Sequence, residues 1–299
     1  MDRSALIDAI EAVIHQEVGR NIAPLFDAAR GGLRGAVAAL ADASGTIGLI
    51  TGFYVPGGFP PAAETDGPAA TALLARGLRR VGLSCRVCTD APCASACAAA
   101  LSAAGVAEVP VDVVQLGGSV AETVAIWRAR EVRLVIAIER CGRTADGTAR
   151  NMRGEDISGH TALLDELFLA GPWDTIAVGD GGNEIGMGRL PRALIAAHIV
   201  HGATIACVTP ATHLILSGVS HWGAYALVGG LAAMRADWRP ALLDCLDPAL
   251  DHAILEATVR NGPAVDGVTR QRTVTIDSLE PATHLRVLQA IRALVQQAG

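Results

Sequence analysis

The sequence predicts an α/β fold with an open, mostly parallel sheet and helices on both faces, and two observations carry this prediction. First, six short apolar runs recur along the 299 residues, separated by stretches rich in Ala, Leu and Arg that are typical of helices. Second, the runs are continuously apolar, as expected for parallel strands buried on both faces. The expected strands cover residues 46–55, 83–90, 108–116, 133–140, 174–181 and 203–210. This pattern predicts a Rossmann-like arrangement.

Helices are expected before, between and after these strands. Residues 1–41 form a helical lead-in, because their apolar side chains recur at helical spacing. A proline in the first turn favours a helix that starts at residue 67, and a final helix is expected over residues 281–297. The turn-rich stretch 260–280 is expected to add a late strand. No repeat, linker or change of composition divides the chain, which predicts a single domain over residues 1–299.

Composition excludes several classes of function. The net charge is −6 and the basic residues are scattered, so no basic surface for nucleic acid is expected. All 24 basic residues are arginine, which excludes a Schiff-base lysine for pyridoxal phosphate and the lysine of a P-loop. The most apolar region, residues 203–234, is interrupted by Pro210, His213 and His221, so no membrane span is expected. The 51% hydrophobic content favours a homo-oligomer.

Seven cysteines leave two interpretations open. Four of them, in CRVCTDAPCASAC, have a spacing that suits zinc or an iron–sulfur cluster. We favour buried small side chains, because Cys85 and Cys88 would point to opposite faces of a strand. The other two, Cys93 and Cys97, lie on an Ala-rich stretch typical of a helix. The odd count and an acid-containing N-terminal helix, unlike a secretion signal, predict a cytoplasmic protein.

Polar side chains follow three of the expected strands, and the carboxyl ends of strands form the ligand-binding edge of such a sheet. After the first strand, AETDGP places Glu64, Thr65 and Asp66 just before the helix that begins at Gly67. Thr65 or Asp66 is expected to cap that helix, whose free N–H groups would bind an anionic substrate. Glu64 is not needed for capping, which favours a role as a metal ligand or in acid–base chemistry.

The loop after the fifth strand, VGDGGNEIGMG, combines several glycines with two carboxylates. A dinucleotide fingerprint would need its third glycine where Glu184 stands, so no NAD site is expected. A plain turn would explain Asn183 and Glu184 as the start of a following helix. It leaves Asp180 unexplained, together with Gly181 and Gly182, whose bare backbone would let a ligand approach. We therefore expect Asp180 and Glu184 to bind a metal, and the Gly-Gly-Asn segment to bind substrate.

The densest group of polar residues follows the fourth strand. Glu139 and Arg140 close that apolar strand at the ligand edge, which favours Glu139 as a proton carrier and Arg140 as an anion-binding residue. The following loop contributes Asn151 and Arg153 as substrate-binding candidates. His160, at the start of the run HTALLDELF, is a catalytic candidate, although a histidine there equally serves as a cap or a core residue.

Five motifs, in their order and spacing, resemble the C-terminal domain of the D-glutamate cyclase family: TGFYVPG, AETDGP, IERCGR, NMRGEDISGHTALLDELF and GDGGNEIGMG. The resemblance runs from about Thr46 to past Gly188 and is weaker toward the C-terminus. It implies an α/β domain and an enzyme, a hydro-lyase that converts D-glutamate to 5-oxo-D-proline with loss of water.

These residues suit such a reaction. Ring closure needs a deprotonated α-amine and an activated γ-carboxylate, which a divalent cation and a carboxylate acting as base and then acid would provide. Hard oxygen ligands suit Mg²⁺ or Mn²⁺. The expected metal ligands are Glu64, Asp180 and Glu184, and the expected catalytic groups are Glu139, Asp66 and His160. Two alternatives stay open: a metal-dependent hydrolase or phosphatase of a small phosphorylated metabolite, and a non-catalytic protein that binds an anionic metabolite. In each case the partner is a small acidic metabolite.

Overall fold

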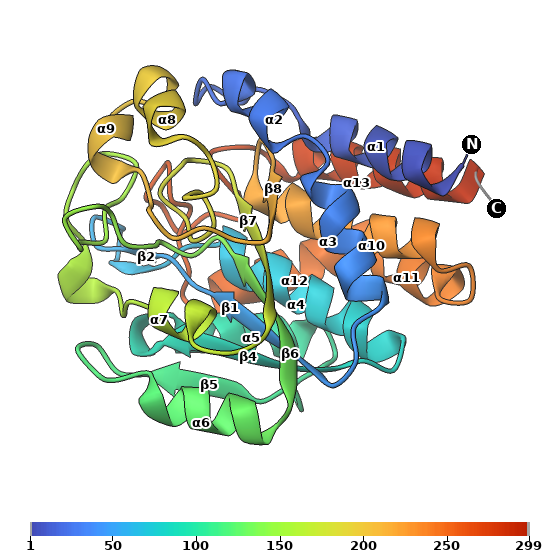
Figure 1. The fold of residues 1–299 in the computed structure, drawn as a ribbon, viewed down its shortest axis with the longest axis horizontal. Coiled ribbons are helices and arrows are strands. Elements are labelled where there is room, and N and C mark those ends of the chain that lie inside the picture. Colours follow the sequence, from blue (N-terminus) through green and yellow to red (C-terminus); the bar gives the residue numbers. More distant parts are fainter. Residues whose placement is uncertain (1, 298–299) are drawn as a thin grey trace.

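The computed structural model describes residues 2–297, and its central feature is a parallel six-stranded sheet (Figure 1). The strands are β1 (Thr46–Thr51), β4 (Ser84–Asp90), β5 (Val111–Val114), β6 (Val132–Ile138), β7 (Asp174–Gly179) and β8 (His213–Leu216). They lie in the order β5-β4-β1-β6-β7-β8, and each neighbouring pair is parallel. The predicted α/β fold with a parallel sheet is confirmed.

Helices cover both faces of the sheet, because alternate side chains of each central strand are buried on opposite sides. In β6, Leu134, Ile136 and Ile138 pack into one core, whereas Val135 and Ala137 pack into the other. The larger core includes α1 (Arg3–Ile14), α3 (Gly32–Ala41), α4 (Asp66–Arg80), α5 (Ala94–Ala103), α10 (Ser220–Met234), α11 (Arg239–Cys245), α12 (Pro248–Arg260) and α13 (Pro281–Gln297). The smaller core includes α2 (Ala23–Ala29), α6 (Ala121–Ala129), α7 (Asp165–Leu169), α8 (Arg192–His198) and α9 (Gly202–Ile205).

The helix α10 is the centre of the larger core. Residues 220–233 of this helix are all buried, and it packs against α1, α3, α4, α11 and α13. A helix that is apolar on every side is stable only when other elements surround it. Because α10 also packs against β7, its first turn reaches the carboxyl edge of the sheet.

The strand order reverses between β1 and β6. From β1 the chain runs outward through β4 to β5, and it then returns to β6 and runs outward on the other side through β7 to β8. The loops that leave the carboxyl ends of β1 and β6 therefore diverge, which opens a crevice between them. A short antiparallel ribbon of β2 (Tyr54–Val55) and β3 (Ala62–Ala63) lies in the loop after β1.

Three local predictions are wrong. Residues 203–210 are not a strand: they form most of α9 and then a segment whose Cys207 and Thr209 pair with the backbone of the loop after β7, so HLIL at 213–216 is the sixth strand. No helix begins at Asn183, since the loop stays irregular until α8 begins at Arg192. Residues 260–280 make isolated bridges but no named strand.

Other elements follow the expectations. The helical lead-in is divided into α1, α2 and α3, and the final helix matches the predicted bounds. All seven cysteines are buried and unpaired, with Cys85 and Cys88 on β4 and Cys97 on α5. Within residues 2–297, no helix has the length and apolar character needed to cross a membrane. The homo-oligomer and the cytoplasmic location stay predictions.

Candidate functional site

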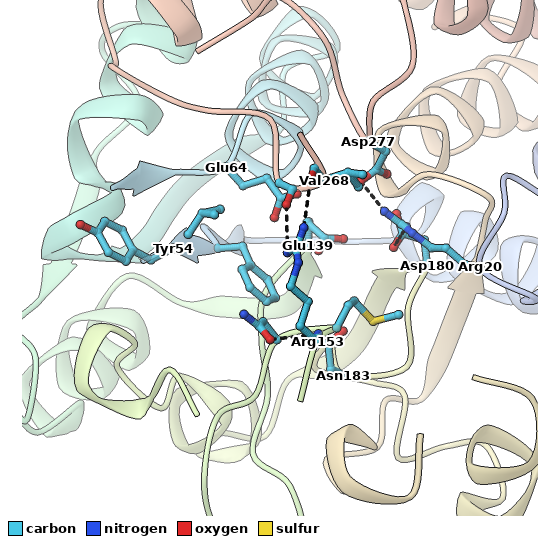
Figure 2. A pocket seen from close by; sticks show the side chains of 14 residues that line it. Arg20, Tyr54, Glu64, Glu139, Arg153, Asp180, Asn183, Val268 and Asp277 are labelled. Carbon is cyan, nitrogen blue, oxygen red and sulfur yellow. Dashed lines mark hydrogen bonds and ion pairs between the residues drawn. The ribbon is translucent and has the colours of Figure 1, made fainter. Parts of the chain in front are cut away.

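A cavity of about 250 Å³ lies at the crevice between the carboxyl ends of β1 and β6 (Figure 2). The predicted loops after β1, β6 and β7 supply most of its wall, and the α1–α2 loop and the segment before α13 complete it. The lining residues are Arg20, Phe53, Tyr54, Val55, Glu64, Glu139, Asn151, Met152, Arg153, Asp180, Asn183, Gly267, Val268 and Asp277.

Three buried carboxylates meet beside this cavity. Asp66, Glu139 and Asp180 each have an oxygen within 4.8 Å of an oxygen of the other two, and we call them the carboxylate group. Asp66 is 1% exposed, and neither of its carboxylate oxygens has a hydrogen-bond partner among the described residues. The Oε2 atom of Glu139 has none either. Since an unpartnered buried charge is costly, these oxygens are candidates for binding a ligand.

The backbone brings these carboxylates together at some cost in strain. Glu139 has φ of 43° and Asp277 has φ of 55°, in the left-handed region that residues with a side chain rarely adopt. At Gly67, a Cβ atom would lie 2.6 Å from Thr51 Oγ1 and 3.1 Å from the carbonyl oxygen of Glu139. Only glycine therefore allows α4 to begin this close to the end of β6.

Several carboxyl groups are buried close together around the cavity, which favours their protonated form or the binding of a cation. Burial, reinforced by neighbouring carboxylates, raises the pKa of Glu64, Asp66 and Glu139 well above their ordinary values. Burial likewise raises the pKa of Asp277 to about 7. Burial opposes the charge of Arg20, but its ion pairs with Asp180 and Asp277 hold the pKa of the guanidinium well above its ordinary value. Figure 2 shows Arg20 between these two carboxylates.

The loop after β7 uses its two carboxylates differently. Glu184 does not line the cavity: it accepts hydrogen bonds from the N–H groups of Asp180, Gly181 and Gly182 at 3.0, 2.6 and 2.7 Å. Burial, with Asp180 next, raises the pKa of Glu184 to about 7. Asp180 lines the cavity, and one of its oxygens accepts a 2.7 Å hydrogen bond from the N–H group of Ser220. The structure thus brings Asp180, but not Glu184, to the cavity.

The two arginines expected to bind carboxylates lie in different environments. Arg140 is fully buried and does not line the cavity, and it donates to the carbonyl oxygens of Gly52 and Ala162 and to Asp90. Its guanidinium cross-links the loops beneath the sheet edge. Arg153 is exposed at the cavity, where it donates to the carbonyl oxygen of Val268 at 2.9 Å.

The remaining sequence candidates mostly organise loops. Asn151 lines the cavity, yet its amide donates to Glu155 and its carbonyl oxygen accepts from the backbone of Arg153. The hydroxyl of Thr65 donates to the carbonyl oxygen of Thr275. His160 is exposed and stacks on Tyr54, outside the set of lining residues. Asn183 lines the cavity and donates to the carbonyl oxygen of Arg150.

Two charged residues of the site were not predicted. Arg20 lies in the loop between α1 and α2, and Asp277 lies just before α13. Glu17 fixes the first of these loops by accepting from the N–H groups of Gly19, Arg20 and Asn21. A lone arginine and a lone aspartate in segments with no strand before them give no local signal, so sequence reasoning had nothing from which to find them.

An acidic cavity at the point where a parallel sheet reverses its strand order is typical of ligand sites in doubly wound α/β folds. The chain belongs to the family described as "D-glutamate cyclase-like, C-terminal", which it matches over residues 10–292. It is also 45% identical over 101 residues to the Homo sapiens protein named "D-glutamate cyclase, mitochondrial". That match covers 32% of this chain and 16% of the human protein, so it spans only a small part of either one.

Proposed function

We propose that the protein is a hydro-lyase that cyclises D-glutamate to 5-oxo-D-proline with loss of water, assisted by a divalent cation. One observation carries the proposal: unpartnered carboxylate oxygens beside a small cavity at the ligand edge of the sheet, in a member of this family. The name of the human relative supports D-glutamate as the substrate.

The reaction balances without any co-substrate. The α-amine nitrogen bonds to the γ-carboxyl carbon, and one carbon–oxygen bond of that carboxyl group breaks. Two protons leave the ammonium nitrogen and end on the departing oxygen, which leaves as water. A carboxyl group that accepts a proton and then returns it is therefore sufficient for acid–base catalysis.

Glu64 is the carboxyl group best placed for this proton transfer. It lines the cavity, and burial raises its pKa well above the ordinary value, so it serves as an acid as well as a base. Glu139, which the sequence favours for this role, belongs instead to the carboxylate group. The proposed assignment thus exchanges the roles that the sequence analysis gave to Glu64 and Glu139.

Asp66, Glu139 and Asp180 would hold the cation, because hard carboxylate oxygens suit Mg²⁺ or Mn²⁺. When bound, such a cation supplies Lewis-acid polarisation of the γ-carboxylate. Asp180 keeps its orientation through the N–H group of Ser220. Arg153, exposed at the cavity, binds the α-carboxylate of the substrate.

Product analysis tests this proposal. The protein is incubated with D-glutamate and Mn²⁺, and 5-oxo-D-proline is measured by chiral chromatography. We expect product with the unaltered chain and with Asp237→Asn, an exposed control, but not with Asp180→Asn. Turnover of phosphate esters in place of D-glutamate would establish the phosphatase alternative. Glutamate binding without turnover would establish the binding-protein alternative, and either result refutes the cyclase.

A further inference from the structure

A histidine buried behind the carboxylate group has no role in the mechanism above. His221 lies in the first turn of α10, is 1% exposed, and places Nε2 2.7 Å from Oδ1 of Asp251 on α12. Its other ring nitrogen, Nδ1, lies 3.9 Å from Oδ1 of Asp66 and has no hydrogen-bond partner among the described residues. Three helices thus bring Asp251, His221 and Asp66 together in that order, and Asp66 belongs to the carboxylate group.

The contacts of the histidine fix its orientation. The ring packs edge-on against Tyr225, with 4.8 Å between the ring centres. Burial opposes the charge of Asp251, but the neighbouring imidazole keeps the pKa of this carboxyl group below its ordinary value. An ionised carboxylate is only an acceptor, so Nε2 carries the proton that Asp251 accepts. Nδ1 is the ring atom turned toward Asp66, and it can donate to this carboxylate when both ring nitrogens carry a proton.

An outer polar group of this kind commonly orients a ligand of a metal. Loss of a residue that holds a metal-binding side chain in place typically weakens metal affinity by about 10–100-fold. Neither oxygen of Asp66 has a hydrogen-bond partner among residues 2–297, and Nδ1 of His221 faces one of these oxygens.

We infer that His221, held by Asp251, is a positioning residue that aims the carboxylate of Asp66 at the cation and thereby sets the affinity of the site for it. This inference rests on the proposed function for the presence of a cation, but not for the identity of the substrate. His221 and Asp251 both lie on helices, away from the loops that line the cavity.

Two substitutions of His221 that introduce an amide side chain distinguish the role of Nδ1 from that of Nε2. The amide nitrogen of asparagine lies near the position of Nδ1, whereas that of glutamine lies near Nε2. His221→Asn therefore keeps a polar atom facing Asp66, and His221→Gln keeps only the contact with Asp251. Mn²⁺ binding to the full chain is measured by isothermal titration calorimetry without substrate. We expect His221→Gln to weaken Mn²⁺ binding about 10-fold or more, and His221→Asn to stay within about threefold of the unaltered protein.

Each other outcome overturns the inference. Equal Mn²⁺ affinity for the two variants, or weaker binding by His221→Asn, shows that His221 only fills the core. If neither variant folds, Asp251→Asn carries the test: we expect it to weaken Mn²⁺ binding several-fold, and unchanged affinity refutes the inference. Absence of Mn²⁺ binding by the unaltered chain refutes both this inference and the cation in the proposed function. Mn²⁺ binding with the expected difference, but without turnover of D-glutamate, refutes only the cyclase.

Discussion

Two buried carboxylates at the carboxyl edge of the sheet have opposite environments. Glu184, in the loop after β7, accepts hydrogen bonds from three backbone N–H groups of its own loop. Asp66, at the start of α4, is equally buried but has no hydrogen-bond partner among the described residues. Their sequence settings look alike, since each follows an expected strand and lies close to glycine. A carboxylate whose partners are all internal maintains the loop, whereas one without partners is available to a ligand.

The largest expected effect is on catalysis and concerns Asp66, the carboxylate without a hydrogen-bond partner. Asp66→Asn keeps the shape of the side chain and removes the charge from the carboxylate group. We expect kcat/KM for D-glutamate to fall by about 10³-fold, equivalent to about 4 kcal/mol. Without added cation, the free energy of unfolding should stay the same or increase, because no hydrogen bond is lost. Chemical denaturation and steady-state kinetics measure the two quantities, and a large loss of stability would contradict the assignment.

The next prediction concerns the stability that Glu184 provides through its hydrogen bonds to the loop. Glu184→Gln places an amide N–H₂ group against backbone N–H groups that now meet a carboxylate. Because donors are then left unsatisfied in a buried loop, we expect the free energy of unfolding to fall by about 3 kcal/mol. Glu166→Gln, an exposed position on α7, is the control and should have little effect. Equal urea midpoints for the two variants would show that the loop does not depend on Glu184.

The same contrast explains what could be predicted from the sequence. Glu64, Asp66, Glu139 and Asp180 could be placed at one edge, because parallel strands bring their carboxyl ends together. Which of their oxygens have partners could not be predicted, since hydrogen bonds to Ser220 or to loop amides depend on the folded chain. For the same reason the roles of Glu64, Glu139 and Glu184 could not be separated. Carboxylates of one residue type differ only in their surroundings.

Long-range contacts explain the other differences. Arg20 and Asp277 come from opposite ends of the chain and meet only because the α1–α2 loop and the segment before α13 reach the same sheet edge. The predicted position of the sixth strand is wrong because two apolar stretches, residues 203–210 and 213–216, are both suited to lie beside β7. Residues 213–216 pair with β7, while Thr209 pairs with the loop that Glu184 stabilises. Strand propensity alone does not choose between them.

A third prediction extends the comparison to arginines. Arg140 is buried and donates to Asp90 and to two backbone carbonyl oxygens, whereas Arg153 is exposed at the cavity. We expect Arg153→Met to raise KM for D-glutamate about 10-fold, or about 1.4 kcal/mol, with a thermal midpoint close to that of the unaltered chain. Arg140→Met should instead lower the thermal midpoint, because it leaves Asp90 as an unpaired buried charge. A reversed pattern would show that Arg140, and not Arg153, binds the substrate.

The smallest expected effect concerns Asp277, which has more polar partners than Asp66 and fewer than Glu184. One oxygen pairs with Arg20 and the other has no hydrogen-bond partner among residues 2–297. Burial raises the pKa of this carboxyl group from 3.8 to about 7, so the folded protein holds a proton there more tightly than the unfolded chain does. Its contribution to stability is therefore fully present below pH 3.8 and is lost as the pH rises through about 7.

This direction of change can be tested by measuring the thermal midpoint against pH in the protein without cation. Between pH 5 and pH 8 the thermal midpoint should fall, and Asp277→Asn should reduce that fall by about 3 °C, because an amide does not titrate. Glu184, whose pKa is also raised to about 7, contributes a fall of the same sign in both proteins. The difference between them therefore reports Asp277 together with its effect on Glu64 and Asp66, whose pKa it helps to raise. If the two proteins lose stability equally over this range, Asp277 is ionised throughout, and the ion pair with Arg20 satisfies it as fully as the loop amides satisfy Glu184.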